Sequence, residues 1–241
     1  MAVWLVAVLQ PGIILVADPQ GQYSYDLPAQ IWMASLFIGA GAVVDYLDGF
    51  LARLLKAGSE MGRELDSLSD VVTFGVAPSL ILYQFLRLSF AADQEALDQT
   101  TIGLLPAFFI PAAAAWRLAR FNLNAGAAAP TYFQGLPVPA AGLFIASLPL
   151  IYWNVNDNWV LSTLLSPLFL YAVIGLLSGL MVSKIPILAF KFSSYTWKEN
   201  KLRYSTVLLA IVLSVFLKWL AIPLTIVGYV LLSLFFKKQF A

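Results

Sequence analysis

Long apolar stretches separated by short polar segments follow one another along most of the chain. Because a bilayer about 30 Å thick needs roughly 20 apolar helical residues to cross it, this pattern predicts membrane-spanning helices. We place about eight spans, at residues 1–17, 28–52, 64–86, 102–123, 137–153, 159–183, 204–219 and 220–236. The sequence therefore predicts an all-α fold, a polytopic transmembrane helical bundle embedded in a lipid bilayer.

The predicted spans form a single integral-membrane domain over residues 1–241, with a core over about 1–190 and a C-terminal helical hairpin over about 204–238. The last two spans meet near Lys218 with almost no loop, so they form either a tight hairpin or one broken helix. The first window is short and contains Gln10 and Pro11. It lacks the early basic region and the cleavage site of a signal peptide, so we expect a short or truncated span.

The polar segments alternate in charge. Those at 53–63, 117–120 and 184–203 are basic, whereas those at 18–26, 93–98 and 154–158 are acidic or neutral. Since basic loops stay in the cytoplasm, we expect both termini on that side. All but Arg87 and Lys218 of the 14 basic residues then lie on the cytoplasmic side.

The composition of the chain excludes several kinds of catalytic site. The chain is 61% hydrophobic and 11% charged, and it has no Cys and no His. It therefore lacks a thiolate nucleophile, an imidazole base and the usual zinc ligands. With a net charge of +1 it has no overall basic excess, so we expect no nucleic-acid partner.

Four aspartates interrupt the second and third predicted spans. At about 100° per residue, one face of the second span carries Asp45, Asp48, Gly49, Ala52 and Arg53. One stripe of the third span carries Gly62, Asp66 and Asp70. The link between Arg53 and Gly62 is short enough for two antiparallel neighbours, so both faces should meet at the cytoplasmic boundary of the membrane.

Four carboxylates in one small volume of a membrane protein repel one another unless cations bind them. Two divalent cations, Mg²⁺ or Mn²⁺, prefer such oxygen ligands. Gly49, Ala52 and Gly62 leave room for a bulky ligand, and Arg53 offers a planar donor for phosphate. This combination is typical of displacement at phosphorus.

A divalent-cation transporter is the alternative from another class, because it also places carboxylates inside a helical bundle. The cluster lies at one membrane face, however, and Arg53 would repel a permeating cation. A purely structural scaffold would have no use for four such aspartates. Arg53, Lys56 and Arg63, taken singly, also fit ordinary positive charges at the ends of spans.

The pattern D-x2-D-G-x2-A-R-x8-G-x3-D-x3-D resembles the signature of the CDP-alcohol phosphotransferases at every position. Four further segments, 70–78, 117–122, 133–141 and 181–186, resemble the members of that family that use serine. Such relatives usually carry a polar Thr and Asn motif entering the first span, which this chain lacks. We therefore expect that the start is truncated or that contacts made there are missing.

The resemblance implies a site and a reaction. Asp45, Asp48 and Asp66 would hold one metal, and Asp45, Asp66 and Asp70 the other. Asp70 would be the general base that deprotonates the hydroxyl of L-serine, which attacks the β-phosphorus of CDP-diacylglycerol and expels CMP in one direct step. The nucleotide site would be lined by Asp48, Gly49, Ala52, Arg53 and Gly62. The family also implies a homodimer.

The acceptor is less constrained than the metal site. We expect Arg120 to hold the serine carboxylate and Asn122 to donate hydrogen bonds, while Arg117 fits a topological anchor equally well. Lys184 and Lys191 are at the edge of a basic loop, where solvated side chains are common. Glycerol phosphate, inositol phosphate and choline would use an identical metal site, so these acceptors stay open.

Overall fold

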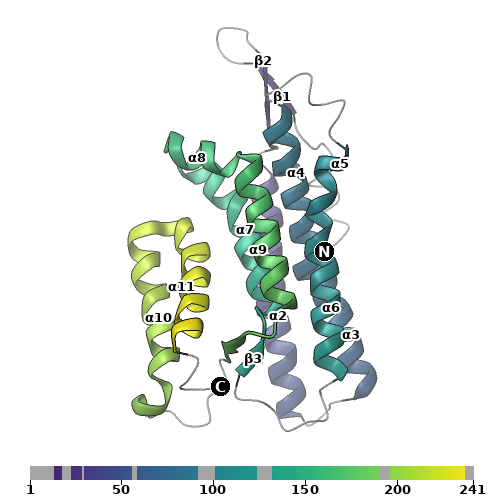
Figure 1. The fold of residues 1–241 in the computed structure, drawn as a ribbon, viewed down its shortest axis with the longest axis vertical. Helices are drawn as coiled ribbons and strands as arrows, with labels where there is room; N and C mark the ends of the chain where they lie inside the picture. Colours follow the sequence, from purple (N-terminus) through teal and green to yellow (C-terminus); the bar gives the residue numbers. More distant parts are fainter. Residues whose placement is uncertain are drawn as a thin grey trace.

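The computed structural model describes residues 14–17, 23–28, 30–55, 59–91, 101–123, 132–189 and 196–236. Most of them are helical, and the long helices run side by side along the longest axis of the molecule (Figure 1). The helices are α2 (Ile31–Leu54), α3 (Glu60–Asp70), η1 (Val71–Val76), α4 (Ala77–Ala91), α5 (Thr101–Leu104), η2 (Leu105–Phe108), α6 (Phe109–Leu123), α7 (Val138–Asn154), α8 (Asn158–Leu164), α9 (Pro167–Val182), α10 (Trp197–Leu217), η3 (Lys218–Leu220) and α11 (Ala221–Phe235).

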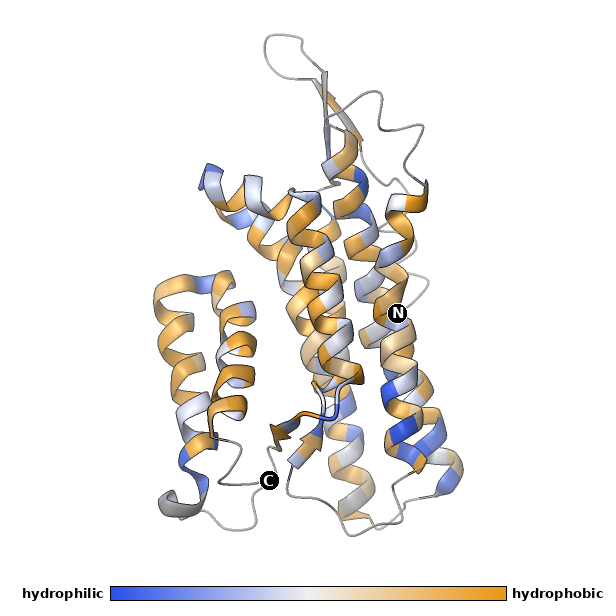
Figure 2. Ribbon diagram, in the orientation of Figure 1, coloured by the Kyte–Doolittle hydropathy of each residue, from blue (hydrophilic) through white to orange (hydrophobic). Residues whose placement is uncertain are grey.

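The middle parts of these helices are apolar and their polar residues gather toward the ends, as Figure 2 shows. Within the described residues, four helical stretches are long and apolar enough to cross a membrane: Ile31–Ala52, Glu60–Ala91, Ile102–Leu123 and Asn200–Phe235. A fifth is added if α8 and α9 count as one bent span. The protein is therefore a helical integral membrane protein, and these stretches do not confirm a count of eight spans.

Two predicted spans differ from the structure. The first, 1–17, ends in strand β1 (Ile14–Ala17) instead of a helix, and residues 1–13 lie outside the described part. β-Branched Ile14 and Val16 suit that strand. The span 159–183 is divided into α8 and α9, which are bent by 62°. Pro167 begins α9 and disfavours helical geometry at Ser166, which is extended.

The expectation of an all-α fold needs a second correction, because two small antiparallel sheets are present. Strand β1 pairs with β2 (Tyr23–Asp26), and β3 (Tyr132–Gln134) pairs with β4 (Pro186–Leu188). Strands of three or four residues are too short for a hydrophobic alternation to predict them. The second sheet joins the segment before α7 to the segment after α9.

Gly135 makes the turn after β3 possible. Its φ is +74°, and an added Cβ would stand 2.6 Å from the carbonyl oxygen of Met181 and 2.7 Å from that of Leu180. Only glycine combines this backbone conformation with so close an approach. The turn therefore fixes β3 against the C-terminal end of α9.

One buried apolar core unites α2, α4, α6, α7 and α9, and its largest fully buried side chains include Phe74, Phe85 and Ile145. Helix α7 approaches η1 so closely that a Cβ on Gly142 would stand 2.9 Å from the Cβ of Phe74. Small residues allow this close packing between membrane helices. The core thereby fixes η1, which directly follows Asp70.

A break in helical geometry follows the acidic stripe. Residues Val71–Val76 form a π-helix, η1, between α3 and α4. Pro78 has no N–H to donate to the carbonyl of Phe74, and its ring would clash there in a regular helix, which accounts for the wider turn. At the other end of α3, the Ser59 hydroxyl caps the helix by accepting a hydrogen bond from the Gly62 N–H at 3.0 Å.

Candidate active site

The four aspartates face one cavity of about 660 Å³ between α2 and α3. Asp45 and Asp48 come from α2, whereas Asp66 and Asp70 come from α3. Asp45 and Asp70 are half-buried, and Asp48 and Asp66 are exposed. The structure therefore brings together the two helical faces that the spacing of the sequence predicts to meet.

Asp45 is at the centre of the cluster. Its carboxyl group interacts with those of Asp66, Asp70 and Asp48. Neighbouring carboxylates repel one another unless a proton or a cation is shared between them. The cavity therefore has a strong preference for bound positive charge.

The donor chemistry fits Mg²⁺ or Mn²⁺, which prefer carboxylate oxygens. Within the described part of the chain, however, no group of three or more His, Cys, Asp or Glu side chains forms a ready-made metal site. Binding of two cations by Asp45, Asp48, Asp66 and Asp70 would therefore require these side chains to draw closer together than they are in the structure.

Small residues line the cavity beside the carboxylates. Gly49, Ala52 and Gly62 all contribute to the wall, and a Cβ added to Gly49 would meet nothing within 4 Å. The backbone of Arg53 lies in α2, but its side chain is outside the described part. In the sequence, Arg63 fits an ordinary positive charge at the end of a span. In the structure it lines the cavity and supplies a cation there.

Arg117, whose role the sequence leaves undecided, lies beside the candidate site. Its side chain is only 6% exposed, lies near Asp70 and Arg120, and has its guanidinium carbon 6.0 Å from the centre of the Phe133 ring. Among the described residues, its Nε has no hydrogen-bond partner. The signal that could have identified it is an arginine inside a predicted span, which is functional by default.

Arg120 has a different environment, one turn further along α6. It donates hydrogen bonds to the carbonyl oxygens of Val182 at 2.6 Å, Ser183 at 2.9 Å and Gln134 at 3.4 Å. Two of these carbonyls belong to the end of α9, where cations are favoured. Arg120 therefore joins α6, β3 and α9 beside Arg117.

Asn122 connects α6 to the helix that carries the acidic stripe. Its Nδ2 donates to Ser67 Oγ at 3.0 Å and Glu64 Oε2 at 3.2 Å, both on α3. In the described part of the protein, its buried Oδ1 has no hydrogen-bond partner. Asn122 thus joins α3 to α6 through its amide nitrogen.

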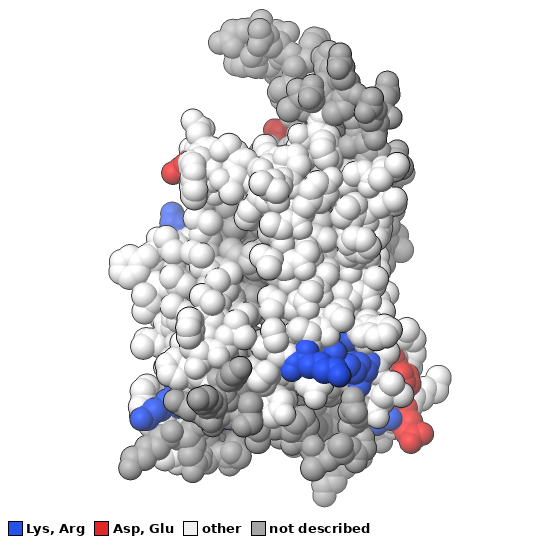
Figure 3. Space-filling view, viewed as in Figure 1, with Lys and Arg blue, Asp and Glu red and all other residues white. Residues whose placement is uncertain are grey.

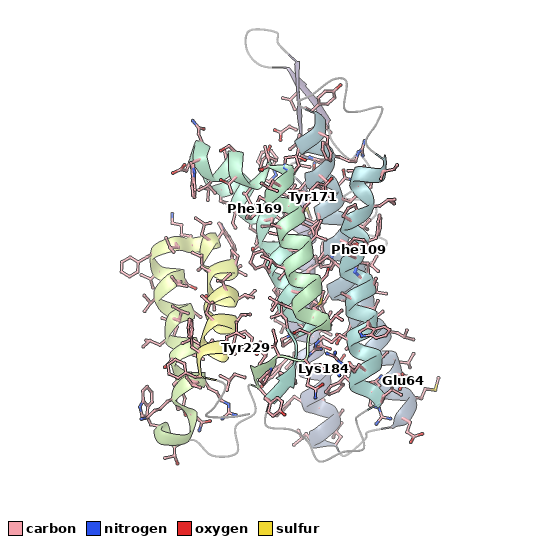
Figure 4. All side chains as sticks on the ribbon, viewed as in Figure 1. Glu64, Phe109, Phe169, Tyr171, Lys184 and Tyr229 are labelled. Carbon is pink, nitrogen blue, oxygen red and sulfur yellow. The ribbon has the colours of Figure 1, made fainter. Side chains whose placement is uncertain are left out.

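Basic and acidic side chains gather at the same end of the molecule. Figure 3 shows Lys and Arg near the ends of α6 and α9, beside the acidic side chains of α3. Figure 4 places Lys184 and Glu64 at this end, below Phe109 and Phe169. Lys184 is exposed, and Lys191 lies outside the described residues.

A second cavity of about 520 Å³ lies between α7 and the C-terminal helices. Its lining is almost entirely apolar and includes Phe133, Pro137 and Ala140 on one side and Thr206, Ile226 and Tyr229 on the other. Phe133 also contacts Arg117, so this apolar cavity begins close to the charged site.

The family model and three similar known proteins indicate the same family of enzymes. The family described as CDP-alcohol phosphatidyltransferase matches residues 4–177. A Bacillus subtilis (strain 168) protein named CDP-diacylglycerol–serine O-phosphatidyltransferase is 39% identical over 163 residues, which are 67% of this chain and 77% of the relative.

Two other relatives carry the same name. The Helicobacter pylori (strain ATCC 700392 / 26695) protein is 37% identical over 162 residues, which are 67% of this chain and 63% of the relative. The Mycobacterium leprae (strain TN) protein is 36% identical over 159 residues, or 64% of this chain. This match spans only 48% of the length of the M. leprae relative.

Proposed function

The chain belongs to the CDP-alcohol phosphatidyltransferase family, and on this premise we propose that it transfers a phosphatidyl group from CDP-diacylglycerol to the hydroxyl of L-serine. The products are phosphatidylserine and CMP. The observation that carries the proposal is the cavity onto which Asp45, Asp48, Asp66 and Asp70 converge. The names of its relatives support serine as the acceptor.

The four aspartates would hold two divalent cations, Mg²⁺ or Mn²⁺: Asp45, Asp48 and Asp66 one, and Asp45, Asp66 and Asp70 the other. When bound, such a pair neutralises charge on phosphate oxygens during displacement. The contacts of Asp45 with Asp66 and Asp70 support this role, because a bound cation would relieve the repulsion between them.

Asp70 would act as the general base. It is half-buried at the end of α3, and the core fixes η1 immediately after it. Its carboxylate accepts the proton of the serine hydroxyl, whose oxygen forms a bond to the β-phosphorus. The bond from that phosphorus to the CMP oxygen breaks, so CMP leaves with its electron pair. No covalent enzyme intermediate is needed.

The cytidine diphosphate would lie along the small residues of α2 and α3. Asp48, Gly49, Ala52 and Gly62 line the cavity, and the open space over Gly49 leaves the backbone accessible to a bulky ligand. Arg53 remains our proposal for a phosphate contact, and Arg63 lines the same cavity. A guanidinium binds phosphate through two parallel hydrogen bonds.

The acceptor would bind beside α6. Arg117 and Arg120 lie near each other and repel, so a carboxylate between them is favourable. We retain Arg120 and Asn122 as acceptor residues and add Arg117, whose buried guanidinium interacts with Asp70. A serine carboxylate held there would place its hydroxyl near the general base, since serine is short.

The gathering of Lys and Arg at the acidic end supports a cytoplasmic active site. The apolar cavity beside Phe133 offers space for an acyl chain of the lipid. We also propose that both termini lie in the cytoplasm. Residues 1–13 and 237–241, which form them, are outside the described part. A homodimer and the division into a core and a C-terminal hairpin also stay predictions.

The proposal is tested by giving the purified protein CDP-diacylglycerol, Mg²⁺ and labelled serine, and measuring the label in extracted lipid. We expect labelled phosphatidylserine and an equal amount of CMP. Parallel reactions contain glycerol phosphate, inositol phosphate or choline in place of serine. Product with one of these acceptors and none with serine would contradict the assignment of the acceptor.

A further inference from the structure

The C-terminal hairpin of α10 and α11 lies beyond residues 4–177, which the family matches, yet it is firmly attached to the core. The hydroxyl of Tyr229 on α11 donates to the carbonyl oxygen of Leu188 in β4 at 2.5 Å. The Leu188 N–H donates to Ser233 Oγ at 3.2 Å, one turn further along α11. The edge of β4 that faces α11 is therefore held by two side chains.

The opposite edge of β4 holds β3. Ile187 of β4 is paired with Phe133 of β3, directly beside the residue that Tyr229 contacts. The ring of Phe133 in turn packs against the Arg117 guanidinium. A continuous series of contacts therefore runs from α11 through the small sheet to the buried arginine.

Tyr229 and Arg117 also interact electrostatically. Tyr229 is only 6% exposed and lines the apolar cavity together with Phe133. Figure 4 shows Tyr229 toward the charged end of the molecule, whereas Tyr171 lies toward the other end. The hairpin thus supplies one wall of the cavity that Phe133 also lines.

We infer that Tyr229 is a positioning residue, which holds the guanidinium of Arg117 beside Asp70 through β4 and Phe133. This inference rests on the proposed function, because it assigns Arg117 to binding of the acceptor carboxylate. Tyr229 itself does not touch the acceptor. It makes the C-terminal hairpin part of the acceptor site.

Positioning matters here because an arginine side chain has several rotatable bonds. Helix α6 fixes only the backbone of Arg117, and among the described residues the Nε has no partner that would orient it. The packed ring of Phe133 restricts the guanidinium before the acceptor arrives. Binding then loses less side-chain entropy, so affinity for the acceptor rises.

The test compares Tyr229→Phe with Tyr171→Phe. Each substitution removes one hydroxyl that donates to a backbone carbonyl, because Tyr171 donates to Gly103 at 2.8 Å. For Tyr229→Phe we expect the KM for serine to rise about three- to tenfold, with the KM for CDP-diacylglycerol unchanged. Tyr171→Phe should leave both constants unchanged. Equal effects of the two variants would overturn the inference.

A double-mutant cycle with Arg117→Lys tests whether Tyr229 changes the serine KM through Arg117. If Tyr229 acts through Arg117, the two substitutions together should raise the serine KM by less than the product of their separate effects. Independent, multiplicative effects would contradict positioning. The wild-type reaction in the same assay tests the proposed function. A wild type without activity would contradict the proposed function, whereas an active wild type with multiplicative effects of the two substitutions would contradict only this inference.

Hydrogen exchange gives a readout that does not depend on turnover. In Tyr229→Phe we expect faster exchange at residues 132–134 and at Ile187 and Leu188, since the bond that holds β4 is removed. Tyr171→Phe should leave the exchange of these residues unchanged. Unaltered exchange in Tyr229→Phe would overturn the role of the sheet even in a protein without activity.

Discussion

The carboxyl groups of Asp45 and Asp70 interact with each other, although one belongs to α2 and the other ends α3. This contact crosses the cavity that also receives Asp48 and Asp66. Four acidic groups in so small a volume destabilise the protein unless a proton or a cation is shared among them.

Asp45→Asn should stabilise the metal-free protein and abolish its response to metal. The amide removes one charge from the centre of the cluster, so the unfolding temperature in chelator should rise. Adding Mg²⁺ or Mn²⁺ at about 100 times its Kd should stabilise the wild type by about 2.7 kcal/mol. The variant should show little of this gain.

Thermal unfolding in detergent, with and without metal, checks this prediction. Asp157→Asn is the control, because Asp157 only caps α8 by accepting hydrogen bonds from the N–H groups of Trp159 and Val160. It should respond to metal like the wild type. Equal metal responses of the wild type and Asp45→Asn would contradict metal binding by Asp45.

Gly49→Val should leave the fold intact and impair use of the lipid substrate. Nothing lies within 4 Å of an added Cβ, so the side chain would extend into the cavity where the nucleotide is proposed to bind. We expect the KM for CDP-diacylglycerol to rise at least about tenfold, a loss of about 1.4 kcal/mol.

Gly179→Val is the matched control for this substitution. Gly179 also has nothing within 4 Å of an added Cβ, but it belongs to α9 and does not line the cavity. Its kinetic constants should equal those of the wild type. Normal lipid kinetics in folded Gly49→Val would remove Gly49 from the nucleotide site.

Gly142→Ala should weaken the packing that fixes η1 after Asp70. The new methyl group would stand 2.9 Å from the Cβ of Phe74, so the helices must separate. Overpacking of this kind costs about 1–3 kcal/mol. Gly175→Ala, which meets nothing within 4 Å on α9, should leave the unfolding midpoint unchanged. Similar unfolding midpoints for both variants would show that this crossing is not tight.

Arg120→Ala should have two separate effects. Loss of the bonds to the exposed carbonyl of Val182 and the partly buried carbonyl of Ser183 costs about 0.5–1.5 kcal/mol of stability. Loss of the guanidinium should also raise the KM for serine far more than that for the lipid. If stability falls and the two KM values change equally, Arg120 is a packing residue only.

Sequence reasoning was effective where periodicity and charge act together. Long apolar stretches predicted the positions of α2, α7 and the helical stretch Ile102–Leu123 to within a few residues. The helical spacing of Asp45, Asp48, Asp66 and Asp70 predicted that they would face one another, because sequence separation on a helix fixes the direction of each side chain.

Other features depend on contacts between distant segments, which no local pattern reveals. The sheet of β3 and β4 joins residues more than 50 positions apart, and the local spacing of apolar residues does not predict such a pairing. In the sequence, Arg117 and Arg120 look like equivalent basic residues, because they lie one helical turn apart near the end of the same predicted span. The structure distinguishes them, because Arg120 contacts the end of α9 whereas Arg117 packs against Phe133.

CMP release from CDP-diacylglycerol, compared between the wild type and Asp70→Asn, decides whether the aspartate cluster catalyses the transfer. We predict release that requires both serine and Mg²⁺ or Mn²⁺, and a loss of at least about 100-fold in the variant, because the general base is removed. Serine-dependent release at equal rates in both proteins, or release that persists in chelator, would contradict this role of the cluster.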